Sequence, residues 1–334
     1  MFRRLVIIFA VVKSFTIKMN IMAYRLLAGI MVIAGLTFSS CNKRQKNPLF
    51  EDYPQLNTLD SEYKSAPEVA KANELLRSLS TVLSDSDFNS ENLVPFLEYG
   101  YAVADEQNMN SRKASFLFPL IKEDFRNEKT ADRLYELIGI MGKMNKSTVV
   151  LVLSDGMRKL FPDNKNTANL SAVVPDSLSD IDAYILDLGK KIFENPDNTG
   201  INRATSLAYV DACEAYALVN PNNPNTAGYL FKAAEVAKSL RTFPKSLSLY
   251  DWIIQDYPDY EKMPTSLFLK GFIIENNLGD DEKARQVYNE FVTRFPNHEL
   301  ADDVQFLIEN LGKTDEEILE MIEQKRQEKQ SDSE

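Results

Sequence analysis

The sequence YLFKAAEVAKSLRTFPKSLSLYDWIIQDYPDYE (Tyr229–Glu261) returns 38 positions later as LFLKGFIIENNLGDDEKARQVYNEFVTRFPNHE (Leu267–Glu299). Identical residues stand at corresponding positions: Lys232 and Lys270, Leu240 and Leu278, Lys245 and Lys283, Tyr250 and Tyr288, Pro258 and Pro296, Glu261 and Glu299. Self-similarity at such a period is typical of proteins in which no single repeat can bury its apolar face alone. We therefore predict that the repeats stack side by side as a solenoid.

Each copy has the pattern of a helical hairpin. In the second copy, one apolar stripe at helical spacing comprises Leu267, Leu269, Ile273 and Ile274. Gly279 then favours the left-handed conformation that ends a helix, and an aspartate after it can cap the next one. The second stripe comprises Ala284, Val287, Tyr288, Phe291 and Val292. Pro296 ends this helix, because proline lacks the N–H that a helix interior needs.

The pattern of the two copies resembles the tetratricopeptide repeat. The residues that carry the resemblance are Gly271, Gly279, Ala284, Tyr288 and Pro296 in the second copy, and Ala233, Ser246, Tyr250 and Pro258 in the first. The period of 38 exceeds the family's period of about 34. The spacing from Gly271 to Ala284 is one residue longer than usual, and Arg241–Pro244 stands where the family prefers a glycine turn. The resemblance covers roughly residues 202–312 and is closest to repeats of bacterial cell-envelope lipoproteins.

The resemblance implies a groove that takes an extended or helical segment of a partner protein. In tetratricopeptide arrays the first helix of each hairpin lines this groove. We expect Lys238, Glu275 and Asn276, the polar residues of those helices, to lie near it. Ordinary solvated surface is an equally good interpretation of each residue taken singly.

The rest of the chain is also predicted to be helical. Gly and Pro are sparse, at 12 and 14 residues, and long stretches between them keep helical spacing. We predict an N-terminal helical-hairpin domain at 65–162 that opens with a capping box at Ser65–Glu68. Its helices are predicted at about 92–105, 112–126, 130–144 and 147–160. Val149–Leu153 has the propensity of a strand, but its neighbours continue a helical stripe.

A polar stretch at 163–177 is predicted to be a linker or long loop between domains. The tetratricopeptide-repeat domain is predicted at 178–330 and begins with helices at about 178–194 and 202–219. Ala301–Leu311 is expected to be another first helix. Thr314–Glu317 has the pattern of a second capping box and opens a charged terminal helix, which suits the end of a solenoid.

Residues 1–41 have the pattern of a secretory signal. Arg25 precedes the apolar run Leu26–Phe38, and Ser39 and Ser40 lead to Cys41. The run is about 13 residues long, whereas a membrane-spanning helix needs about 20. The segment resembles the lipobox of bacterial lipoproteins, which implies that Cys41 is lipidated and becomes the first mature residue. Met19 and Met22 are alternative start sites.

Residues 42–64 are predicted to be a polar tether. The family rule that an aspartate after the cysteine retains a lipoprotein in the inner membrane does not apply to Asn42. We therefore expect a lipid-anchored protein of the cell envelope, in the outer membrane and facing the periplasm. The chain has a net charge of −11, and residues 1–41 contain five basic and no acidic residues, so the mature part has −16. Such an acidic chain is a poor candidate for binding nucleic acid.

No catalytic or metal site is predicted. The chain has one histidine, His298, in a predicted loop, and two cysteines, so a disulfide framework or a Cys/His zinc site is not expected. Cys213 lies on an apolar helical face and is predicted to be a core residue. Trp252 lies in a predicted second helix, where packing is the simpler explanation. We expect no enzyme activity, cofactor or small-molecule substrate.

The sequence therefore favours a non-enzymatic adaptor that binds partner proteins of the envelope through its repeat groove. The alternative is a component of outer-membrane protein assembly resembling the BamD-type lipoproteins, which combine a lipidated cysteine with such repeats. Recovery of barrel-assembly proteins after detergent extraction would distinguish the two. A hydrolase in the N-terminal half is a third possibility, which a polar pocket there would favour.

Overall fold

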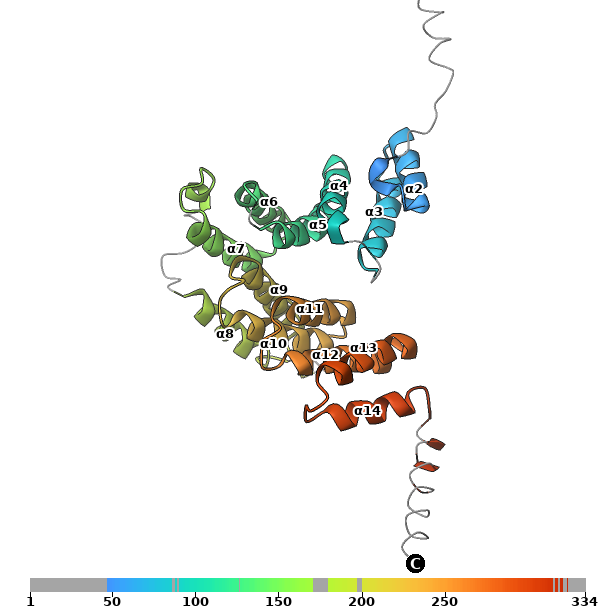
Figure 1. Cartoon of the computed structure of the whole chain (residues 1–334). Coiled ribbons are helices and arrows are strands. Elements are labelled where there is room, and N and C mark those ends of the chain that lie inside the picture. The colour runs from blue at the N-terminus through green and yellow to red at the C-terminus, as the bar shows by residue number, and fades with distance from the viewer. Residues whose placement is uncertain are drawn as a thin grey trace, which may run out of the picture. The chain divides into compact units, whose positions relative to one another are not determined.

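A computed structural model of the chain describes residues 47–85, 88, 90–125, 127–170, 180–196, 200–314, 316–317, 319–320 and 323. Throughout these residues the regular structure is helical and no strand occurs (Figure 1). The predicted all-α class is confirmed, and Val149–Leu153 lies within a helix, α7 (Ser147–Leu160). The predicted signal, with Cys41, lies outside the described residues.

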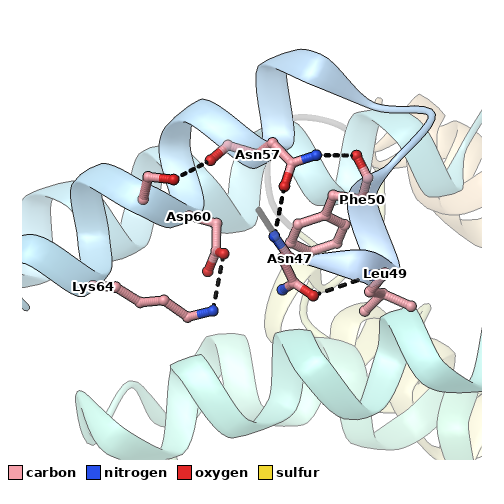
Figure 2. Close-up of polar contacts among 7 residues, drawn as sticks. Asn47, Leu49, Phe50, Asn57, Asp60 and Lys64 are labelled. Carbon is pink, nitrogen blue, oxygen red and sulfur yellow. Dashed lines mark hydrogen bonds and ion pairs between the residues drawn. The ribbon is translucent and has the colours of Figure 1, made fainter. Parts of the chain in front are cut away.

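The chain divides into two compact units, Met1–Phe88 and Asn89–Glu334. The first contains a 3-10 turn, η1 (Pro48–Phe50), followed by α2 (Pro54–Ser65) and α3 (Val69–Leu83). Figure 2 shows how Asn57 of α2 holds η1: its side chain accepts a hydrogen bond from the Asn47 amide at 2.9 Å and donates one to the Phe50 carbonyl. The Phe50 ring is fully buried.

Two predictions for this unit are wrong. The tether expected at 42–64 is helical from Pro54 onward, because Leu56 and Tyr63 are buried at helical spacing. The capping box expected at Ser65–Glu68 does not form: Ser65 ends α2, and Glu68 precedes α3 without capping it through its side chain. Pro67 explains the second error, because the residue before a proline is driven out of the helical region, and Ala66 is extended.

The second unit consists of helices that follow one another in pairs. The first helices of the pairs are α4 (Leu93–Glu106), α6 (Thr130–Lys143), α8 (Ile181–Lys191), α10 (Thr226–Ser239) and α12 (Met263–Ile273). The corresponding second helices are α5 (Asn110–Glu123), α7, α9 (Arg203–Val219), α11 (Phe243–Asp256) and α13 (Asp281–Arg294), and α14 (Ala301–Asn310) follows. These helices pack mainly against their neighbours in sequence. The short 3-10 turn η2 (Ser90–Asn92) precedes α4, and a second one, η3 (Thr167–Leu170), follows α7.

The turns inside four of the pairs share one backbone feature. A residue with positive φ stands two positions before the second helix: Asn108, Asn145, Arg241 and Gly279, with φ of 53°, 57°, 58° and 67°. In the first three turns the next amide donates to a carbonyl five residues back, as in a Schellman motif. Arg241 therefore makes the turn that the sequence assigned to glycine.

The fourth of these turns contains one extra residue. A π-helical turn, η4 (Ile274–Leu278), continues α12, and the Asp280 amide donates to a carbonyl six residues back, that of Ile274. A π-helical turn takes up one additional residue within a helix. It accommodates the long spacing from Gly271 to Ala284.

The junctions between pairs also repeat. The junctions span Asp124–Thr130, Phe161–Thr167, Asn220–Thr226, Tyr257–Met263 and Phe295–Ala301, and each has two successive i to i+3 backbone hydrogen bonds of 2.8–3.1 Å. At the middle position, Asn127, Asn164 and Asn223 accept a further bond from the amide two residues on. His298 takes this place in the last junction, where its Nδ1 accepts from the Leu300 amide at 3.1 Å. The N-terminal half thus contains the same unit, although its sequence does not align with the two copies.

Of the two interpretations of 163–177, a linker between domains is wrong, whereas the described residues between α7 and α8 contain only the short turn η3, which agrees with a long loop. Helices α7 and α9, on either side of this stretch, pack against each other within one unit, and the chain divides at Phe88 instead. Phe161–Thr167 is an ordinary junction. Successive junctions begin 37 or 38 residues apart, whereas those at Phe161 and Asn220 begin 59 apart. The additional residues lie on both sides of α8, because this helix begins 14 positions after Thr167 and 11 residues separate it from α9.

Within the second copy, close contacts hold α12 against α13. A Cβ atom on Gly271 would lie 2.6 Å from a ring carbon of Tyr288, so only glycine fits beside this aromatic ring. Tyr288 is fully buried, with Leu267, Ala284 and Phe291 around it. Tyr250 is likewise fully buried, and Pro258 and Pro296 directly follow the C-caps of α11 and α13.

Candidate partner-binding face

The three polar residues predicted for the groove lie close together around Phe272. The Lys238 ammonium of α10 lies 5.0 Å from the centroid of the Phe272 ring. The Asn276 amide donates to the Phe272 carbonyl at 3.1 Å and to the Glu275 carboxylate at 3.3 Å. The structure thus joins Lys238, Glu275 and Asn276 into one cluster where α10 meets α12 and η4.

Glu275 has a structural role within this cluster. Its carboxylate accepts a hydrogen bond from the Tyr288 hydroxyl at 2.6 Å. Burial and this carboxylate both raise the pKa of Tyr288, which therefore stays protonated and remains a donor. Lys238 and Asn276 are the members of the cluster whose charge or amide is better placed to meet a partner, since Asn276 is exposed and Lys238 is half-buried.

A groove of about 650 Å³ lies between two first helices, α8 and α10. Its apolar lining comprises Leu186, Ile192, Phe193, Tyr209 and Val236. Its polar lining includes Lys190 from α8, and Lys232 and Glu235 from α10. A concave, mostly apolar site with a few charged groups is the usual form of a recognition site.

Two side chains of the groove expose much apolar surface. Phe193 is 71% exposed and Leu186 is 48% exposed, and they stand seven residues apart on one face of the chain around α8. Exposed large apolar side chains that gather beside a groove are typical of interaction sites. Within the described part of the chain, neither Lys190 nor Lys232 forms an ion pair, so both ammonium groups are available to a partner.

The sequence did not identify these groove residues. Leu186 and Phe193 have the spacing of a core stripe, and Lys190 and Lys232 have that of a solvated face. Only the packing of α8 against α9 shows that part of the α8 stripe is left uncovered. The extra residues of the third pair are the one sequence signal that bears on the groove, since insertions in repeat proteins commonly map to the binding face.

The remaining reactive groups are held in structural contacts. Cys213 is fully buried, and burial raises the pKa of its thiol to about 12, which makes it a poor nucleophile. Asp182 accepts hydrogen bonds from the hydroxyls of Tyr216 and Tyr229 at 2.9–3.0 Å and so fastens α8 to α9 and α10. Among the described residues, no group of three or more acidic, His or Cys side chains is arranged to hold a metal ion.

Comparisons with known proteins assign no family to the chain. No protein-family model matches it, and no curated protein matches it significantly. Of the helices in the described part of the chain, none combines the length and the apolar character needed to span a bilayer.

Proposed function

We propose that the protein is a non-enzymatic, lipid-anchored adaptor of the bacterial envelope, built as a tetratricopeptide-like solenoid. Cys41 would anchor it to the membrane, by expectation the outer membrane, and the first helices would bind a segment of a partner protein. The proposal needs no cofactor and no chemistry at the groove.

One observation carries this proposal: the departures from the repeating helix pair flank or continue first helices. The additional residues flank α8, and α8 lines the 650 Å³ groove. The fifth pair contains η4, which bears Glu275 and Asn276. The π-helical turn is often found at functional sites. Regular positions of a repeat maintain packing, whereas local departures from it are where a specific function is expected.

Site-specific photocrosslinking in intact envelopes tests the proposed face. A benzophenone amino acid replaces Phe193 in the groove or, as the control, Leu160, which is exposed on a second helix. We expect one or a few defined adducts from position 193 and none of these from position 160. The same adducts from both positions, or none from a folded protein at 193, would contradict the proposal. Adducts with barrel-assembly proteins would favour the outer-membrane assembly alternative.

The lipid anchor has a separate test. Labelled fatty acid is expected to enter the wild-type protein and to be absent from the Cys41→Ser variant. Equal labelling of both proteins would contradict the proposed lipid anchor at Cys41 but not the proposed binding of a partner at the groove.

A further inference from the structure

A second concave site lies mainly among the second helices of the pairs. Its volume is about 350 Å³, and it is lined by residues of α5, α7, α9 and α11, by Met141 near the end of α6, and by the turn between α6 and α7. The apolar part of the lining comprises Ala114, Phe118, Pro119, Met141, Met144 and Val149. None of these residues lines the groove between α8 and α10. Methionine side chains adapt readily to the shape of a ligand.

The charged groups of this cavity neutralise one another. Lys146 pairs with Asp211 at 2.5 Å, and Lys245 pairs with Glu214 at 2.8 Å. Burial acts to lower the pKa of Lys245, but the Glu214 carboxylate outweighs burial and raises it, so the ammonium stays charged. The lining therefore has two positive and two negative groups, and none of the four is left to pair with a charged ligand.

Contacts between helices far apart in the sequence lie beside the cavity and reach it through Phe118. Phe118 of α5 and Trp252 of α11 meet edge to face, with ring centroids 6.2 Å apart. Beside them, the Lys122 ammonium lies 3.0 Å from the Asp256 carboxylate and 5.4 Å from the centroid of the Trp252 ring. These contacts join the first and fourth pairs, so the walls of the cavity are set by the curl of the repeat array.

From this geometry we infer that the cavity binds an uncharged, predominantly apolar small molecule. An apolar cavity of about 150 Å³ is large enough to bind benzene, and 350 Å³ accommodates a larger ring system. A charged ligand would lose its hydration without gaining an unpaired partner, which is unfavourable. The cavity shares no lining residue with the groove between α8 and α10, so this inference does not rest on the proposed adaptor function.

Two fluorescent probes that differ by one charged group test the ligand class. N-phenyl-1-naphthylamine is uncharged, and 8-anilinonaphthalene-1-sulfonate has the same rings with a sulfonate. Trp252 is the only tryptophan of the chain and contacts Phe118 of the lining, so energy transfer from it reports binding at this cavity. The chain from residue 41 onward, with Cys41→Ser, is used so that neither detergent nor the apolar run Leu26–Phe38 is present.

We expect saturable, one-to-one binding of the uncharged probe with quenching of Trp252, and at least tenfold weaker binding of the sulfonate. The absence of saturable transfer to the uncharged probe in a folded protein would overturn the inference. Equal affinity for the two probes would overturn the ligand class.

A matched pair of serine variants tests the location. Ser115 on α5 lines the cavity and Ser248 on α11 does not, yet both are exposed and both donate to the carbonyl three residues earlier at 2.8 Å. Ser115→Phe should fill the cavity and lower the affinity for the uncharged probe at least tenfold. Ser248→Phe should leave this affinity unchanged. Unchanged binding by a folded Ser115→Phe protein would contradict the location.

A second variant keeps the location testable if Ser115→Phe does not fold. Met144→Glu, at a half-buried position, places an unpaired carboxylate in the lining and should also lower the affinity for the uncharged probe at least tenfold.

The protein partner that crosslinks at position 193 should bind without displacing the probe from the cavity. If that partner displaces the probe, the cavity receives a side chain of the partner and not a small molecule, which would overturn the inference.

Discussion

The Tyr288 hydroxyl donates to the Glu275 carboxylate at 2.6 Å, whereas the hydroxyl of Tyr250, 38 positions earlier, is buried with no hydrogen-bond partner in the described part of the chain. The first copy has Ala237 where the second has Glu275. Two tyrosines in the same place of the repeat thus differ in one polar contact. A buried hydroxyl without a partner is unfavourable, while one bonded to a carboxylate stabilises the fold.

Removing the two hydroxyls should therefore have different effects. We expect Tyr288→Phe to lower the free energy of unfolding by about 1 to 2 kcal/mol, because Glu275 loses a charge-assisted bond. Tyr250→Phe should change it by less than about 0.5 kcal/mol or raise it. Urea unfolding followed by circular dichroism measures both variants. An equal loss of stability would mean that the Tyr288–Glu275 bond contributes nothing beyond ring packing.

Replacing Arg241 in its left-handed turn by glycine should increase the stability of the protein. Its φ of 58° is unfavourable for a residue with a Cβ, by roughly 1 kcal/mol or more. Arg241→Gly should therefore stabilise the protein by up to about 1 kcal/mol, and Gly279→Ala at the equivalent position should destabilise it by about the same amount. Thermal unfolding of both variants checks the opposite signs. Destabilisation by Arg241→Gly would indicate that the arginine side chain matters more than its backbone conformation.

Two glycine-to-alanine changes test how closely α12 and α13 approach. The new Cβ of Gly271→Ala would lie 2.6 Å from the Tyr288 ring, whereas Gly139 of α6 has no atom within 4 Å of the new position. We expect Gly271→Ala to destabilise by about 1 to 3 kcal/mol through overpacking. Gly139→Ala should stabilise by about 0.5 to 1 kcal/mol, because alanine favours the helix.

The loss of stability caused by Gly271→Ala should also be confined to the helices near the substitution. Helices in the second unit pack mainly on their sequence neighbours, so stability should be of nearest-neighbour character. Hydrogen exchange should increase over residues 264–314 and change little over 93–160. Uniform loss of protection across the second unit would show one cooperative globule instead of successive pairs.

His298 should be replaceable by asparagine. Its Nδ1 occupies the place of Asn127, Asn164 and Asn223 in the other junctions, and its ring meets Phe291 edge to face at 5.5 Å. His298→Ala should cost about 1 to 2 kcal/mol through loss of the hydrogen bond and the ring contact. His298→Asn should lose less, because its side-chain oxygen can accept from the Leu300 amide. Denaturant midpoints in the order wild type, asparagine, alanine are expected, and equal midpoints for the two variants would contradict the junction role.

Buried tyrosines should make the protein sensitive to alkali. Burial raises the pKa values of Tyr209, Tyr250 and Tyr288, while in the unfolded chain a phenol titrates near pH 10. Above about pH 10 the unfolded chain therefore releases protons that the folded chain retains. The stabilising contribution is fully present below that pH and is lost as the pH rises above it.

Absorbance at 295 nm and helical circular dichroism, recorded together, measure this coupling. We expect a late fraction of the tyrosines to ionise only as the helical signal is lost. Complete ionisation near pH 10 with the helical signal intact would contradict the burial of these side chains.

The sequence by itself determined the local structure. Apolar spacing placed α4, α6, α7, α9 and α14 within one or two residues of their observed ends, because a helix is set by contacts of short range. The terminal capping box also formed as predicted, with Thr314 and Glu317 bonded to each other's backbone amides. The period of 38 identified two similar helix pairs within Tyr229–Glu299, whereas the extent of the second unit came from the structure.

Only the tertiary structure decided what the pairs leave uncovered. Apolar residues with core spacing, Leu186 on α8 and Phe193 just after it, are largely exposed, and Trp252 meets Phe118 from a helix more than a hundred residues away. Neither fact is available from local sequence, because both depend on how small rotations between successive pairs add up along the array. The repeated junctions could not be recognised from the sequence for a related reason. Their hydrogen bonds are between backbone groups and form with Asn, Tyr or His at the middle position, so the same geometry occurs with different residues.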